Sequence, residues 1–181
     1  EAYTMSHDMN PDMNADDFYE ATSKITIADI KKALRKRFRN EQIARLGNNH
    51  IIYKSFNRAL FRKLIERELN RVALFVIERF GLTVVFDASV TDVVYAEGVF
   101  PSQGTRPVLT TIKNLVESRI SKLIVSVLED TMEAAEIHWS FHDSRFTYTI
   151  KNKEGTILKT ITDEATLKLE NLRKSVDPEI Q

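Results

Sequence analysis

The stretch Phe100-Pro-Ser-Gln-Gly-Thr-Arg-Pro-Val-Leu109 separates two helical segments, and it marks where the first ends and the second begins. Upstream, the capping motif Ser89-Val-Thr-Asp92 opens a short helix, which Gly98 and Pro101 end. Downstream, a long helix is expected over about residues 105–131. Its apolar stripe has helical spacing and consists of Val108, Leu109, Ile112, Leu115, Val116, Ile120, Leu123, Ile124, Val127 and Leu128.

Residues 56–80 form the clearest helical pattern before this stretch. We expect its buried face to consist of Phe56, Leu60, Leu64, Val72, Val76 and Phe80, helped by Phe61, Ile65, Leu69 and Ile77. The short β-branched run Leu82-Thr-Val-Val-Phe86 then predicts a strand. Nearer the N-terminus, the capping box Thr26-Ile-Ala-Asp29 opens a helix that extends to about Phe38, and a shorter helical piece starts at Asn40.

The last part of the chain has the period of a sheet. Alternating runs at Glu136-Ile-His-Trp-Ser-Phe141 and Phe146-Thr-Tyr-Thr-Ile150 predict a hairpin, and Thr156-Ile-Leu-Lys-Thr-Ile161 predicts a further strand. A closing helix is expected over residues 163–174. The predicted fold class is therefore α+β, with a helical part that contains one short strand and a small antiparallel sheet at its C-terminal end.

Composition limits the classes of partner. Of the 181 residues, 26 are Lys or Arg and 26 are Asp or Glu, so the net charge argues against nucleic-acid binding. No apolar run approaches the roughly 20 residues of a membrane span, so no membrane partner is expected. The chain has no cysteine, which excludes disulfides and thiolate metal sites and favours a reducing, cytoplasmic compartment. Residues 1–24 lack an apolar period and are expected to be a mobile lead-in.

Several catalytic motifs are missing from the sequence. It contains no G-x-x-x-x-G-K-[ST] phosphate loop, no H-E-x-x-H and no G-x-S-x-G. His138 and His142 share one face of a predicted strand, but no third ligand is placed to complete a metal site, and no metal is expected. Any catalytic role of this chain must therefore be contributed to a site whose main part lies elsewhere.

Arg106 occupies a position that calls for an explanation. It follows Gly104 and Thr105 at the start of the long helix, where the helix dipole is positive and a cation is disfavoured. Free backbone N–H groups and a guanidinium at one helix end favour a bound phosphate. The residues around Arg106 leave two interpretations open. It is either a solvated arginine without a ligand, or an arginine that binds an anion such as a nucleotide phosphate.

Arg45 lies at a similar corner of the chain. It belongs to Phe38-Arg-Asn-Glu-Gln-Ile-Ala-Arg-Leu-Gly47, after a basic helix end and shortly before a glycine that is expected to stop a short helix. One interpretation is a cation that complements the dipole at a helix C-terminus. The other is an arginine that reaches into the site of a neighbouring subunit.

Residues 38–128 resemble the end of an AAA+ ATPase module of the Clp unfoldase and disaggregase type. That family has a segment F-R-P-E-F-x-N-R, then a helix, a strand and a helix, and then G-A-R-P-L at the start of another long helix. Here the first motif is Phe38-Arg-Asn-Glu-Gln-Ile-Ala-Arg45 and the second is Gly104-Thr-Arg-Pro-Val108. The first motif departs from the family at Asn40, Gln42 and Ala44.

The resemblance implies a division of the chain after the lead-in of residues 1–24. Residues 25–53 would be the last part of the large AAA+ subdomain, or a linker, and would carry the arginine-finger segment. Residues 54–162 would form the small, or lid, subdomain with a β extension. Residues 163–181 would be a C-terminal helix that leads to a downstream region, because we expect the chain to be a piece of a longer protein.

The same resemblance implies roles for the two arginines and a set of partners. Arg45 would be the catalytic arginine finger that acts on ATP in the next subunit. Arg106, with Gly104, would form the sensor-2 site for ATP of its own subunit. The implied partners are an upstream large subdomain, neighbouring subunits of a hexameric ring and a protein substrate. ATP and Mg²⁺ would bind only in the full-length assembly.

Two further functions stay open. One is a non-enzymatic interaction or scaffold module with a lid-like fold, in which the arginines are ordinary surface charges. The other is the regulatory part of an AAA+ zinc protease, in which a peptidase domain with H-E-x-x-H would follow residue 181.

Overall fold

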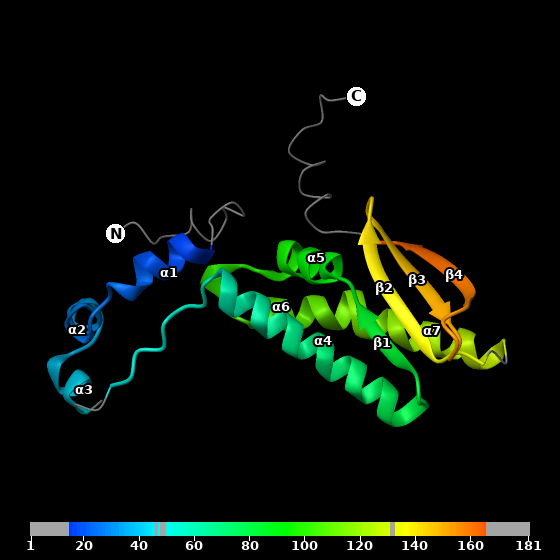
Figure 1. Cartoon of the computed structure of the whole chain (residues 1–181). Coiled ribbons are helices and arrows are strands. Elements are labelled where there is room, and N and C mark those ends of the chain that lie inside the picture. Colours follow the sequence, from blue (N-terminus) through cyan, green and yellow to red (C-terminus); the bar gives the residue numbers. More distant parts are fainter. Residues whose placement is uncertain (1–14, 46, 48–49, 131–132, 166–181) are drawn as a thin grey trace. The chain divides into compact units, whose positions relative to one another are not determined.

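The computed structural model of the chain describes residues 15–45, 47, 50–130 and 133–165. The fold class is α+β, as predicted, with helices and a four-stranded sheet whose last three strands follow the helices along the chain (Figure 1). Two compact units are present. The described residues up to Arg58 together with Phe100–Gly104 form the first, and those of Ala59–Val99 and from Thr105 onward form the second.

The first unit is helical. It contains α1 (Ala15–Ser23), α2 (Ile27–Leu34), α3 (Asn40–Ala44) and the 3-10 turn η1 (Pro101–Gln103). The capping box of α2 is present, because the Asp29 N–H donates to the Thr26 hydroxyl and the Thr26 N–H donates to the Asp29 carboxylate. Hydrogen bonds from Thr26 lower the pKa of Asp29.

Helix α1 is an addition to the prediction. The sequence analysis places its residues in a lead-in, because they show no apolar period. In the structure the Asp16 carboxylate accepts a hydrogen bond from the Arg58 N–H at 2.9 Å, and the hydroxyls of Thr22 and Ser55 lie 2.6 Å apart. Polar contacts therefore hold this helix. Residues 1–14 lie outside the described ranges, and the mobility of the lead-in stays a prediction.

The second unit contains the long helices and the sheet. Its elements are α4 (Arg58–Phe80), β1 (Thr83–Phe86), α5 (Ala88–Gly98), α6 (Arg106–Ile112), the π-helical turn η2 (Lys113–Glu117), α7 (Ser118–Glu129), β2 (Glu136–His142), β3 (Arg145–Lys151) and β4 (Ile157–Glu164). The predicted long helix is thus present as α6, η2 and α7 in succession.

The sheet is mixed and has the order β1-β2-β3-β4. The hairpin of β2 and β3 and the next strand β4 are antiparallel, as predicted. Strand β1 joins them in parallel, with Val84 opposite Ile137, and α5, α6 and α7 form the crossover that a parallel pair requires (Figure 1). Strand β4 extends to Glu164, so the closing helix predicted from residue 163 does not start there, and residues 166–174 lie outside the described ranges.

The buried face of α4 agrees with the predicted one in part, because every apolar residue buried there was among those named. The buried apolar residues are Phe61, Ile65, Leu69, Val72 and Val76. Leu60 and Phe80, which were expected on the buried face, are 43% and 44% exposed. The reason is that α4 carries apolar side chains around most of its circumference, so their spacing does not decide which face packs against the core.

The core lies between the helices and one face of the sheet. Cross-strand pairing brings Trp139 opposite Tyr148 and Ile137 opposite Ile150, and all four side chains are buried. Trp139 also meets Phe86 and Phe146 at ring-centroid distances of 5.3 and 5.7 Å. The alternating residues of both strands therefore share the buried face of this hairpin.

Gly98 sets the approach of α5 to α6. A Cβ atom at this position would lie 3.0 Å from the Thr111 side chain and 3.1 Å from the Val108 Cα atom. Its φ is not in the left-handed region, so crowding rather than backbone conformation requires the glycine. The two helices can pack this closely only without a side chain here.

We predict that Gly98→Ala destabilises the chain by about 1–3 kcal/mol, because the added methyl group overpacks the contact between α5 and α6. Urea unfolding measures the change. A double-mutant cycle with Thr111→Gly, which removes the nearest side chain, should show favourable coupling between the two substitutions. Equal stabilities of Gly98→Ala and the unaltered chain would contradict the prediction.

Candidate functional site

Arg106 is the first residue of α6 and is exposed. Thr105 precedes it as the N-cap residue but makes no side-chain cap, and Pro107 occupies the first turn. The Arg106 carbonyl accepts a hydrogen bond from the Thr110 hydroxyl at 3.1 Å. Its guanidinium makes no ion pair with any residue that the structure describes. A cation that has no counter-charge among the described residues thus lies at the positive end of a helix.

Gly104 belongs to the turn before Arg106, within the first unit. Its φ and ψ are 69° and −144°, a region that only glycine adopts readily. It forms an isolated bridge with Phe100, and the Gln103 N–H donates to the Phe100 carbonyl at 2.9 Å. No atom lies within 4 Å of the place where a Cβ would be. Backbone conformation alone therefore requires this glycine.

Arg45 is the C-cap residue of α3, in the first unit. Its N–H donates to the Glu41 carbonyl at 3.3 Å, and its side chain is exposed. The neighbouring Ile43 is buried and fixes the helix. The position agrees with a cation that complements the dipole at a helix C-terminus. The arginine-finger role stays a prediction, as does any joint action of Arg45 and Arg106, which belong to different units.

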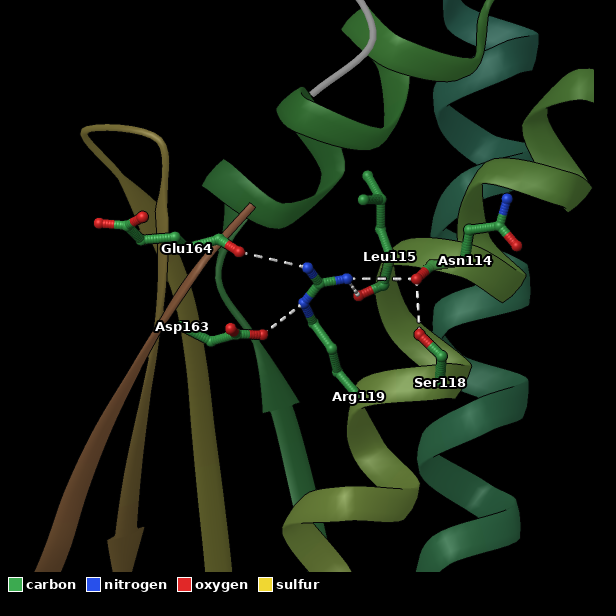
Figure 2. A network of polar contacts seen from close by, with 6 residues as sticks. All are labelled: Asn114, Leu115, Ser118, Arg119, Asp163 and Glu164. Carbon is green, nitrogen blue, oxygen red and sulfur yellow. Dashed lines mark hydrogen bonds and ion pairs between the residues drawn. The ribbon is translucent and has the colours of Figure 1, made fainter. Parts of the chain in front are cut away.

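A third arginine, Arg119, was not recognised in the sequence (Figure 2). Its Nε donates to the Asp163 carboxylate at 2.7 Å, and its Nη1 lies 3.2 and 3.4 Å from the carbonyl oxygens of Asn114 and Leu115. Its Nη2 reaches the Glu164 carbonyl at 3.5 Å. The guanidinium also lies over the Phe146 ring, 5.1 Å from its centroid. Only 17% of this side chain is exposed, so it links the long helix to β4 in a largely enclosed place.

The sequence does hold a signal for the π turn beside Arg119. The buried positions Val108, Ile112 and Leu115 follow a spacing of four and three residues, which would continue at residues 119, 122 and 126. The residues that are actually buried come one position later, at Ile120, Leu123 and Val127. The apolar stripe therefore slips by one residue, and a π turn inserts one residue into an α-helix.

Tyr148 lies buried beside this network. Its hydroxyl has no hydrogen-bond partner among the described residues. Burial raises the pKa of Tyr148, the negative charge of Asp163 raises it further, and Arg119 opposes the rise. The phenol is consequently held in its neutral form.

The histidines of β2 do not belong to a metal site within the described part of the chain, where no cluster of three or more metal-ligating side chains occurs. Hydrogen bonds from Ser89 lower the pKa of Asp87, and the charges of His138 and His142 lower it further. The structure therefore brings the Asp87 carboxylate near the two histidines, which the sequence analysis did not foresee, and the absence of a metal stays a prediction.

None of the helices in the described ranges has both the length and the apolar character needed to cross a membrane. No protein-family model matches the chain, and no curated protein sequence matches it. Its function therefore has to be argued from the residues themselves.

We predict that Arg106→Ala changes the free energy of unfolding by no more than about 0.5 kcal/mol, because the side chain is exposed and makes no ion pair within the described ranges. Arg119→Ala should cost about 2–3 kcal/mol, because it removes a charged donor from the Asp163 carboxylate and from the carbonyls of Asn114 and Leu115. Urea unfolding of the two variants provides the comparison. Equal losses would contradict the different roles assigned to them.

We predict that Tyr148→Phe leaves stability at neutral pH within about 1 kcal/mol, because the hydroxyl has no described partner. In the folded chain the pKa lies above its ordinary value of 10.0. The neutral phenol thus stabilises the fold fully below pH 10, and this contribution is lost as the pH rises beyond that value. Unfolding midpoints above pH 10 should fall less steeply for Tyr148→Phe, whereas Tyr53→Phe, at an exposed ring, is the control.

Proposed function

We propose that the chain is the nucleotide-sensing lid of an ATP-driven AAA+ protein-remodelling machine of the Clp type. The observation that carries the proposal is Arg106, an exposed arginine without a described counter-charge at the N-terminal end of a helix whose cap residue makes no side-chain cap. Such an end is unfavourable by itself and becomes favourable with an anion bound. The triphosphate of ATP supplies that anion.

The order of elements supports the proposal. In the family, a helix, a strand and a helix separate the arginine-finger motif from the motif that opens the next long helix. Here α4, β1 and α5 occupy that interval, and the glycine turn and Arg106 follow. Gly104 has a backbone conformation that suits glycine, the residue found there in the family motif.

The chemistry then divides between the two arginines. Arg106 would bind the phosphates of ATP in its own subunit and transmit their presence to the lid. Arg45 would stabilise charge that develops on the phosphoryl group in a neighbouring subunit of a hexameric ring. The phosphate loop and the groups that hold Mg²⁺ would belong to an upstream large subdomain. The machine would act on a protein substrate in the cytoplasm.

One observation favours a second candidate, an interaction or scaffold module. The C-terminal half of α4 exposes apolar side chains within the second unit, among them Leu74 and Phe75, which are 60% and 55% exposed. Beside Phe75, a hollow of about 370 Å³ is lined by α4 and by residues of η2 and α7. A partner protein that covers this face would explain the exposure without any nucleotide.

We expect Arg106→Ala in the full-length protein to lower ATP turnover roughly ten- to a hundredfold, since it removes hydrogen bonds to a charged group. Arg45→Ala should lower it about a thousandfold or more. Assembly, measured by light scattering, should persist in both variants. Arg79→Ala, an exposed arginine on α4, is the matched control and should leave turnover unchanged. Unchanged turnover in Arg106→Ala would discard the lid and favour the interaction module.

A further inference from the structure

The π turn η2 gives the long helix two possible settings. The Ser118 N–H donates to the Lys113 carbonyl, five residues back, rather than to the Asn114 carbonyl as in an α-helix. One residue is thereby taken up as a bulge. If the bulge moved or disappeared, α6 would turn relative to α7 by about one residue, or about 100°.

Side chains replace the hydrogen bonds that the bulge removes. The Ser118 hydroxyl donates to the Asn114 carbonyl at 2.6 Å, in place of its own N–H. Arg119 adds its Nη1 to the same oxygen and to the Leu115 carbonyl (Figure 2). The donors that stabilise the bulge therefore come from two consecutive residues at the start of α7.

Arg119 is itself held from outside the helix. Asp163, near the end of β4, binds Nε, and the Glu164 carbonyl approaches Nη2. Phe146 of β3 covers the guanidinium. With these partners Nη1 is directed at the two carbonyls, so the end of β4 determines whether Arg119 adds to the cap that Ser118 provides.

From these contacts we propose that Arg119 is a positioning residue: anchored by Asp163, it fixes the bulge at residues 113–117 and thereby the direction in which Arg106 points from α6. The inference rests on the proposed function only where it predicts an effect on ATP turnover. The coupling between β4 and the rotation of α6 about its axis involves the second unit alone.

The chain contains no cysteine, so spin labels can be placed at chosen sites without background labelling. Cysteines replacing Thr110 on α6 and Thr160 on β4, both exposed, report the position of α6 relative to the sheet. A second pair, at Lys122 on α7 and Thr160, is the internal reference. Distances between the labels are measured by pulsed electron paramagnetic resonance in the unaltered chain and in Asp163→Asn.

In Asp163→Asn the 110–160 distance distribution should shift or broaden, while the 122–160 distribution stays unchanged. Arg119→Lys should behave like Asp163→Asn, because the single nitrogen of a lysine keeps the charge but cannot span Asp163 and the helix carbonyls as Nε and Nη1 do. Glu164→Gln is the matched control: it removes the exposed ion pair with Arg145 but keeps the Glu164 carbonyl, so it should change neither distance.

Unchanged 110–160 distances in folded Asp163→Asn would overturn the inference. If that variant does not fold, Ser118→Ala tests the same point, since it removes only the hydroxyl donor and should give a smaller shift in the same direction. Equal shifts at both label pairs would also overturn it, because they would indicate general loosening rather than rotation of α6.

Turnover of the full-length protein separates this inference from the proposed function. We expect Asp163→Asn to lower ATP turnover several-fold, less than Arg106→Ala does. If the 110–160 distance shifts in Asp163→Asn but Arg106→Ala keeps normal turnover, the coupling between β4 and α6 is supported and the lid function is rejected. If Arg106→Ala lowers turnover but the distance does not shift in Asp163→Asn, only the positioning role of Arg119 is rejected.

Discussion

The second unit depends on one constraint, the slip of a single residue in the apolar stripe of its long helix. A straight α-helix could bury the side chains before residue 113 or those after residue 117 against the sheet, but not both sets together. The π turn absorbs the extra residue and returns both sets to one face. Its cost is a backbone carbonyl deprived of its α-helical donor, and Ser118 and Arg119 compensate for that loss. Packing of the helix and polar capping of the bulge are therefore parts of one solution.

This solution joins parts of the chain that are far apart in sequence. The helix containing the bulge belongs to the crossover between β1 and β2, and the residue that anchors Arg119 comes from β4, at the opposite edge of the sheet. Strand β2 pairs in parallel with β1 and antiparallel with β3. These strands therefore share one buried face of aromatic and β-branched side chains. The start of α6, with Arg106, is thus connected through one continuous helix to a strand that ends at Glu164.

Much of this fold could be predicted, because helices and strands of this chain have strong periodicity. The alternation in β2 and β3 predicted both strands, and the stripe after Arg106 predicted a long helix. The buried face of α4 was predicted only in part, since apolar residues surround that helix and only tertiary contacts select Phe61 and Ile65 over Leu60 and Phe80. Helix α1 was missed because polar contacts to Asp16 and Thr22, which leave no period, hold it in place.

The candidate site was predictable to a different extent. Arg106 and Gly104 stand out locally, because a cation at a helix start and a glycine in a tight turn conflict with ordinary preferences. Arg119 does not stand out, since its importance comes from Asp163, 44 residues away, and from carbonyl groups freed by a bulge. The one-residue slip in the stripe would have indicated the bulge, but no pattern in the sequence identifies the carboxylate that anchors it.

Strand β4 carries a further consequence. It is an outer strand of the sheet in the described part of the chain, and such strands can recruit strands of other molecules. Its charged residues Lys159, Asp163 and Glu164 hinder that addition, and each also pairs with a neighbouring element, with Asp130, Arg119 and Arg145 respectively. The same charges thus keep copies apart and hold the strand to its own molecule. A neutral replacement at this edge would therefore both remove an ion pair that holds the strand and remove a charge that opposes strand addition.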